Sequence, residues 1–407
     1  MLSRRRAWTV AIVATLTMTV SYIDRSSLAV LGDSVSKALG INNTEFGWLA
    51  SAFSIAYMFS TPLAGWWIDH VGARRGLVRS VLVWTAIAAS HALVPGFGVM
   101  FAMRIALGFA EGPSFPGAAQ TIQRILPAED QARGFGILFT GSSIGGMLVP
   151  PLASWLFNIG GWRFAFLGTA LAGLVWVPAW ILVTRHPEVR ARLDAHRLAS
   201  AEVARRSVRE RLSAYVDRNM IRAWLPVLAA APIAGFGLTW AAKFLARTFD
   251  VKQGDVGHYL WLSPLLFDLG AITFGDLASR RRARGNTTPP RLLFVVAMVL
   301  ATTILGLRFV GGPWETVLVI GVAMMGSGAI YTLLTADLLS RVPPDAVSFA
   351  GGTVAAAQSL ILIIANPLIG ASVDATGSYD VAATVLAVWT VPGCIAWILM
   401  KPRPTPT

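Results

Sequence analysis

An arginine and a carboxylate stand seven residues apart in a stretch that is otherwise apolar enough to lie in lipid. Arg104 and Glu111 belong to the segment Arg104-Ile-Ala-Leu-Gly-Phe-Ala-Glu111-Gly-Pro-Ser-Phe-Pro-Gly. Seven residues are close to two helical turns, so the two side chains share one face about 10 Å apart along the helix axis. Ionisable groups at membrane depth are costly and usually face a bundle interior or a water-filled path. The pair therefore predicts a polar site inside the molecule.

A second charged pair, Asp24 and Arg25, lies in the first apolar stretch. An organic anion needs a fixed cation, and Arg25 and Arg104 are permanent cations. Coupling to protons needs a carboxylate that can be charged or neutral. Burial raises a carboxylate's pKa and a neighbouring arginine lowers it, so a carboxylate between lipid and arginine can be poised between the two. Asp24 and Glu111 are the candidates.

The alternative is a closed network that only locks the helices, by pairing Asp24 with Arg104 or Arg25 with Glu111. Four buried charges make a costly lock where apolar packing would serve as well.

The composition is that of an integral membrane protein. The 407 residues are 55% hydrophobic and only 14% charged, with a mean hydropathy of +0.61, whereas a soluble protein carries about a quarter charged residues. A helical span needs about 20 mostly apolar residues. The sequence predicts twelve such spans and hence an all-α fold; they lie near 8–31, 46–68, 77–95, 98–123, 134–157, 163–184, 222–246, 258–278, 291–310, 315–339, 348–372 and 379–400.

The net charge of +13 reflects topology more than a nucleic-acid partner. With a cytoplasmic N-terminus, most Lys and Arg residues fall in cytoplasmic segments, which is the positive-inside rule and puts both termini in the cytoplasm. Contact with anionic lipid headgroups follows as a secondary consequence. The few basic residues expected outside are Lys37, Arg163, Arg247, Lys252 and Arg308.

The remaining residues give no sign of an enzyme, a cofactor or a metal site. The first apolar stretch is too long for a signal-peptide core and carries two charges, so we expect it to be the first span. The single cysteine, Cys394, excludes an internal disulfide and a Cys-based metal site. No nucleophile–base pair, metal-ligand cluster or phosphate loop is visible, which leaves a membrane enzyme or receptor as a remote alternative.

A polar, arginine-rich linker divides the chain into two halves. We expect an N-terminal six-helix bundle over 1–184, a cytoplasmic linker over 185–221 and a C-terminal six-helix bundle over 222–407. The halves echo one another weakly, because a Gly- and Asp-containing segment followed by arginines ends both the second and the eighth span. Secondary transporters are often built from two such repeats, with the substrate site at the midplane between them.

The segment that ends the second span resembles the loop signature of the major facilitator superfamily. It reads Gly65-x-x-x-Asp69-x-x-Gly72-x-Arg74-Arg75. We expect glycine to permit close helix approach, and the nearby arginines to offset the unfavourable position of Asp69 at a helix C-terminus. The resemblance implies that this loop is a gating latch.

A narrower resemblance is to the anion:cation symporters, which include bacterial sugar-acid transporters, vesicular glutamate transporters and sialin. It rests on Tyr22-Ile-Asp24-Arg25, Tyr57, the Arg104–Glu111 segment and Gly161-Trp162-Arg163-x-x-Phe166. The resemblance implies that Asp24 and Glu111 take part in proton coupling and that Arg25 contacts the substrate carboxylate. Arg104 is then expected to tune the two carboxylates.

Further residues are candidate substrate ligands. Tyr22 and Tyr57 could bind substrate hydroxyls or fill gaps between helices. Ser142 stands where sugar-acid symporters often carry a glutamine, among small residues that equally suit close packing. Lys243 could bind substrate, pair with Asp268 or extend to the membrane surface. Gln358 could contact substrate or join two helices.

The sequence thus predicts a monomeric bacterial inner-membrane transporter that imports an organic anion, such as a sugar acid, together with protons by alternating access. The alternative is an exporter or uniporter of the same fold for a different small molecule. The expected partners are the anion, protons and membrane lipid, with no nucleic acid and no cofactor.

Overall fold

The computed structural model describes residues 2–194, 218–285, 290–341 and 347–402, and every regular element in these ranges is a helix. The chain separates into two compact units. Unit 1 holds Met1–Ala199 and Asp250–Trp261, and unit 2 holds Ser200–Phe249 and Leu262–Thr407. The middle of the expected linker lies outside the described residues.

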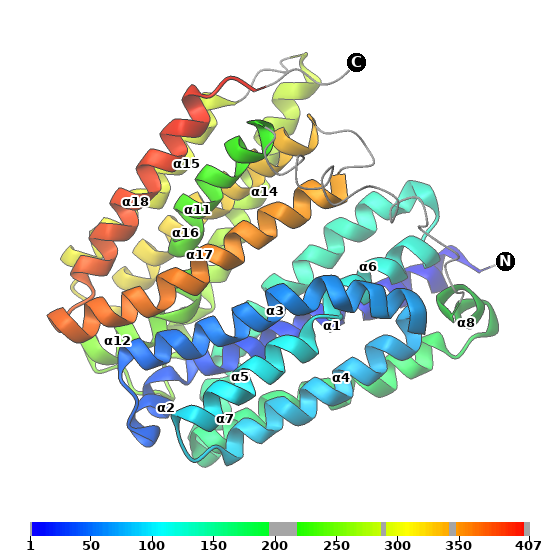
Figure 1. Cartoon of the computed structure of the whole chain (residues 1–407), viewed down its shortest axis with the longest axis horizontal. Coiled ribbons are helices and arrows are strands. Elements are labelled where there is room, and N and C mark those ends of the chain that lie inside the picture. Colours follow the sequence, from blue (N-terminus) through cyan, green and yellow to red (C-terminus); the bar gives the residue numbers. More distant parts are fainter. Residues whose placement is uncertain (1, 195–217, 286–289, 342–346, 403–407) are drawn as a thin grey trace. The chain divides into compact units, whose positions relative to one another are not determined.

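Unit 1 is a bundle of long helices from the first half of the chain, with one short helix from later in the sequence (Figure 1). Its helices are α1 (Arg4–Val30), α2 (Gly32–Leu39), α3 (Asn43–Val71), α4 (Ala73–Ser90), η1 (His91–Leu93), α5 (Phe97–Glu111), α6 (Ser114–Ile125), α7 (Ala128–Thr184), α8 (Pro187–Asp194) and α13 (Gly257–Leu260).

Local sequence explains where α3 begins and ends. At its start, Asn42 and Glu45 form a capping box, in which the Glu45 amide donates to Asn42 Oδ1 at 2.8 Å and the Asn42 amide donates to Glu45 Oε2 at 2.9 Å. At its end, Gly72 takes a φ of 83°, a left-handed backbone that favours glycine. The sharp turn into α4 therefore depends on Gly72.

The fourth expected span is broken immediately after Glu111. Helix α5 ends at Glu111, and α6 begins at Ser114 after Gly112 and Pro113. Pro113 has no amide hydrogen, so Phe109 O loses its usual helical donor and accepts instead from the Gly112 amide at 3.3 Å and from Ser60 Oγ of α3 at 2.6 Å. A neighbouring helix thus helps to satisfy the carbonyl at the break.

Of the described helices, nine are long and apolar enough to cross a membrane. Helix α7 contains two of the twelve expected spans, because its backbone leaves the helical region at Gly160 and Gly161. The expected second span corresponds to α3, and the expected fourth to the broken pair α5–α6. The twelve stretches thus all correspond to helices.

Glycine permits close packing of α1 on α7. A Cβ added to Gly141 would meet Thr15 O at 2.6 Å, and one added to Gly145 would meet Thr19 O at 2.6 Å. By contrast, a Cβ added to Gly65 would meet no described atom within 4 Å. The role of Gly65 in the gating loop stays a prediction.

The segment Asp250–Trp261 comes from the second half of the sequence yet packs with the first. Gln253 Nε2 donates to Val30 O at 2.7 Å, and its Oε1 accepts from Ser34 Oγ at 3.2 Å. The Gly257 amide donates to Ser154 Oγ of α7 at 2.9 Å. These contacts attach the segment to the end of α1, to α2, and to α7 shortly before its irregular backbone at Gly160.

Unit 2 is the second helical bundle (Figure 1). A buried ionic network ties its helices at one end: Asp337 pairs with Arg222 and, at 2.7 Å, with Arg341. Arg222 also donates to Met400 O at 2.9 Å. Its helices are α11 (Arg218–Thr239), α12 (Ala241–Phe249), α14 (Leu262–Ala283), α15 (Arg291–Thr302), η2 (Thr303–Phe309), α16 (Pro313–Leu339), α17 (Val347–Thr376) and α18 (Asp380–Leu399).

Candidate functional site

The charged residues of α1 and α5 meet inside unit 1. Arg25 Nη2 lies 2.9 Å from Glu111 Oε2, and Arg25 Nε donates to the same oxygen at 3.2 Å. Ser21, one turn before Arg25, donates to that oxygen at 2.6 Å and accepts from Arg25 at 2.8 Å. One carboxylate oxygen of Glu111 therefore receives three hydrogen bonds. The other, Oε1, is buried without a partner among the described residues.

Arg25 is surrounded by aromatic faces. Its guanidinium carbon lies 4.4 Å from the ring centre of Tyr22, 4.7 Å from that of Tyr57 and 4.9 Å from that of Phe53. These distances are those of cation–π contacts. The two tyrosines thus pack their rings on the cation, in addition to any contact their hydroxyls make with substrate.

Arg104 lies against the same phenylalanine. Its guanidinium carbon is 4.9 Å from the Phe53 ring centre, and only 4% of the residue is exposed. In the described part of the chain it donates to two backbone carbonyls, Leu49 O at 3.4 Å and Arg25 O at 3.3 Å, and to no carboxylate. Phe53 therefore separates two cations, of which Arg25 alone has an ionic partner.

Asp24, unlike Glu111, is a buried carboxylate without a hydrogen-bond partner among the described residues. It is 3% exposed, and neither carboxylate oxygen has a hydrogen-bond partner among the described residues. The considered lock between Asp24 and Arg104 is therefore absent from this structure. The other considered pair, Arg25 with Glu111, is present.

This geometry sets up a competition at Arg25. The Arg25 side chain is 16% exposed and Glu111 is fully buried, so an incoming anion would meet the arginine first. A guanidinium edge binds one carboxylate at a time in the bidentate manner. A second carboxylate that binds the Nε–Nη2 edge would therefore compete with Glu111 for Arg25.

Sequence reasoning missed Ser21 and Phe53. Ser21 stands four residues before Arg25, which places it on the same helix face one turn away. That spacing could have identified it. Nothing in the sequence distinguishes Phe53 from the other aromatic residues of the apolar spans, so its contact with the two arginines could not be predicted.

The expected gating loop contains a contact that the signature did not indicate. Asp69 Oδ1 accepts from Gln120 Nε2 of α6 at 2.6 Å, and Gln120 Oε1 accepts from the Ala73 amide at 3.1 Å. Trp180 Nε1 donates to Arg74 O at 3.1 Å. Gln120 thus links the end of α3 to the start of α4.

The other candidate ligands lie on α7 beside Tyr22, in the case of Ser142, and in unit 2, in the case of Lys243 and Gln358. Ser142 on α7 donates to Phe139 O of its own helix at 2.7 Å. In unit 2, Lys243 is buried on α12, and its substrate and ion-pair roles stay predictions. Gln358 lines a cavity of about 20 Å³ beside Ser327 and Tyr331, which is room for about one water molecule.

The sequence profile described as Major Facilitator Superfamily matches residues 14–365, most of the chain. The chain belongs to the major facilitator superfamily. Its relatives in this superfamily are transporters and not enzymes. The predicted all-helical, multi-pass membrane fold is confirmed.

Similar members of the superfamily carry sugar acids. The hexuronate transporter of Escherichia coli (strain K12) is 25% identical over 98% of this chain and 94% of its own. The D-galactonate transporter of Escherichia coli O6:H1 is 23% identical over 97% of this chain and 96% of its own. The galacturonate transporter of Dickeya chrysanthemi is 27% identical over 66% of this chain and 80% of its own. The predicted resemblance to sugar-acid transporters is confirmed.

Solved structures of the superfamily share the fold at low identity. A bacterial homologue of the human lysosomal transporter Spinster has a TM-score of 0.76 and 16% identity over 98% of this chain and 94% of its own. A nucleoside transporter has a TM-score of 0.74 and 14% identity over 97% of this chain and 100% of its own.

Proposed function

We propose that this protein imports a sugar acid or a similar organic anion together with protons, by alternating access. The observation that carries the proposal is the buried Arg25–Glu111 pair. Relatives named for hexuronate, galacturonate and galactonate transport support the substrate class. The protein would lie in a bacterial inner membrane as a monomer with both termini in the cytoplasm.

Coupling would follow from the competition at Arg25. When Glu111 takes a proton, it no longer attracts the guanidinium as a charged partner, and Arg25 is free to bind the substrate carboxylate. When the proton leaves, Glu111 reclaims Arg25 and the anion is expelled. The proton and the substrate would therefore favour each other's binding, as symport requires.

Asp24 would be the second proton carrier. An unpaired charge in such a buried place is costly, so we propose that Asp24 holds a proton in this structure. Arg104, which has no ionic partner among the described residues, would supply the positive field that acts on both carboxylates.

The roles proposed for the other candidate residues follow from where they stand in the sequence. Tyr22 and Tyr57 would orient the anion around Arg25, and Ser142, Lys243 and Gln358 would contribute polar contacts. The loop that contains Gly65, Asp69, Gly72, Arg74 and Arg75 would act as the gating latch.

The test is uptake by the purified protein in proteoliposomes. Galacturonate, glucuronate and galactonate are supplied outside, with and without an inward proton gradient. Wild-type uptake should require the gradient. Uptake by Arg25→Ala should be lost, because the substrate carboxylate loses its cation. Arg163→Ala is the control, since this arginine stacks on Trp162 at 4.1 Å, away from Glu111.

Uptake that saturates without a gradient and survives Arg25→Ala would refute the symport proposal. That result would support the alternative, an exporter or uniporter for a different small molecule.

A further inference from the structure

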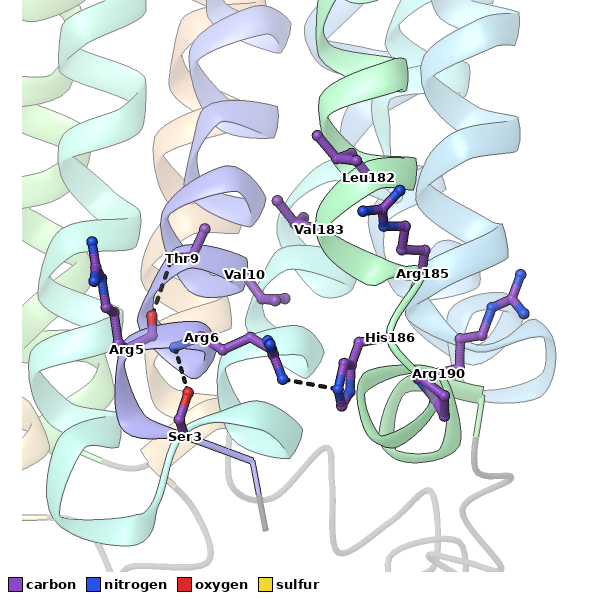
Figure 2. A pocket seen from close by; sticks show the side chains of 11 residues that line it. Ser3, Arg5, Arg6, Thr9, Val10, Leu182, Val183, Arg185, His186 and Arg190 are labelled. Carbon is purple, nitrogen blue, oxygen red and sulfur yellow. Dashed lines mark hydrogen bonds between the residues drawn. The ribbon is translucent and has the colours of Figure 1, made fainter.

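A basic cavity lies at the end of unit 1 that carries the N-terminus. It occupies about 790 Å³ between the first turns of α1 and the junction of α7 with α8. Figure 2 shows its walls, with α1 on one side and the α7–α8 junction on the other. The Arg25–Glu111 pair does not line it, and the proposed transport cycle does not use it.

The polar wall of this cavity is cationic. Arg6, Arg185 and Arg190 are exposed residues that line it, together with half-buried His186. None of the described lining residues is acidic. Arg5 also belongs to the lining, but its side chain points away from His186 in Figure 2.

His186 presents an unsatisfied hydrogen-bond donor. Its Nε2 lies 2.8 Å from a guanidinium nitrogen of Arg6. Arginine can only donate, so Nε2 accepts and the proton of the neutral ring is on Nδ1. Nδ1 is buried and has no partner among the described residues. The ring therefore keeps one unused donor, which an anionic oxygen in the cavity could reach only after the ring turns.

The two helix starts at the cavity reinforce the positive field. Ser3 caps α1 by accepting from the Arg6 amide at 3.4 Å, and α8 begins at Pro187; both residues line the cavity. Helix N-termini attract anions. Helix α8 is held in place because Val189 and Leu193 are fully buried. The cationic wall is therefore built on anchored helices.

The remaining wall includes apolar residues, of which Leu182 faces outward. Val10, Leu182 and Val183 line the cavity. Leu182 is 56% exposed and its neighbour Ile181 is 53% exposed, as expected of side chains that contact lipid tails. A free phosphate ion would use only the cationic wall, whereas a phospholipid would use both.

We propose that this cavity binds an anionic phospholipid of the leaflet at the N-terminal end. Its phosphate would lie among Arg6, Arg185, Arg190 and His186, and its acyl chains would run along Leu182. Basic pockets between spanning helices are known to bind anionic lipid headgroups.

The experiment uses the full-length protein in neutral detergent, with native mass spectrometry after addition of equal amounts of phosphatidylglycerol and phosphatidylcholine. The wild-type protein should retain more phosphatidylglycerol than phosphatidylcholine. Arg6→Gln/Arg185→Gln/Arg190→Gln should lose about tenfold or more of this retention, because each arginine near a membrane surface contributes about fivefold. Thermal unfolding should stay at the wild-type temperature, since all three side chains are exposed.

One control separates this site from general charge. Arg281→Gln/Arg282→Gln/Arg284→Gln removes the same charge from the end of α14, outside the cavity lining, and should keep retention within about twofold of wild type. Equal retention of the two lipids by wild type, or an equal loss in the α14 variant, would overturn the proposal. So would displacement of phosphatidylglycerol by an equal concentration of inorganic phosphate, which would identify a site for the free ion.

Discussion

Arg25 is held by two kinds of interaction that differ in how they respond to a proton. The ionic bond to Glu111 depends on the charge of the carboxylate, whereas the contacts with Tyr22, Tyr57 and Phe53 do not. If Glu111 became neutral, the aromatic rings would still position the guanidinium. Arg25 would then present a preorganised cation to a substrate, which reduces the ordering cost of binding.

The unpartnered carboxyl of Asp24 leads to a prediction about stability. Asp24→Asn is nearly isosteric and removes a group that has no hydrogen-bond partner among the described residues. We expect thermal unfolding in detergent at or above the wild-type temperature, while gradient-driven uptake falls. The matched control is Asp33→Asn, whose native carboxylate pairs with Lys37 one turn away, and which should keep wild-type uptake. A large drop in the unfolding temperature of Asp24→Asn would contradict this description of the site.

At the scale of single residues, the sequence predicted which charged side chains form the site better than it predicted the residues around them. Charges in apolar spans are conspicuous, and helical spacing put Arg104 and Glu111 on one face. It named the Arg25–Glu111 pair only as part of the alternative closed network, because the pairing depends on how α1 and α5 pack. The aromatic rings around Arg25 depend on the same packing.

At the scale of helices, close contact between α3 and α5 depends on small residues. A Cβ added to Gly108 of α5 would meet Phe53 O, and the Ala56 Cβ at 3.1 Å. A Cβ added to Gly98 of the same helix would meet nothing within 4 Å. The two glycines thus form a matched pair, one at a helix contact and one in open space.

We predict opposite effects of alanine at these two positions. Gly108→Ala should destabilise the protein by about 1–3 kcal/mol, as overpacking does, because it pushes α5 away from the helix that carries Phe53. Gly98→Ala should be neutral or stabilise by up to about 1 kcal/mol. Thermal unfolding of both variants in detergent measures the difference. Equal unfolding temperatures would show that α3 and α5 do not pack as described.

Hydropathy predicted the helices well. A segment that crosses lipid must pair its own backbone N–H and C=O groups over about 20 residues, and a helix does so. The break after Glu111 was also predictable from Gly112, Pro113 and Pro116. The attachment of Asp250–Trp261 to unit 1 was not, because its hydrogen bonds join residues far apart in the sequence: Gln253 and Val30 are 223 positions apart, and Gly257 and Ser154 are 103 apart.

For the whole molecule, the distribution of arginine predicts the orientation in the membrane. Cys394 is the chain's one cysteine and is fully buried, so the wild-type background should label poorly with a membrane-impermeant thiol reagent. Ala375→Cys, at the end of α17, should be labelled in intact cells. Arg284→Cys, after α14, should be labelled only after permeabilisation. The reverse pattern would place the termini outside the cell.

The central claim is that charged Glu111 and the substrate carboxylate compete for Arg25, so that a proton on Glu111 favours substrate binding. The most direct measurement compares two assays of Glu111→Gln in proteoliposomes with a substrate that wild type transports: exchange across the membrane without a gradient, and accumulation driven by an inward proton gradient. Gln keeps the shape of Glu111 but cannot lose a proton. We predict that exchange persists and that gradient-driven accumulation is lost. Accumulation at the wild-type level would contradict the account.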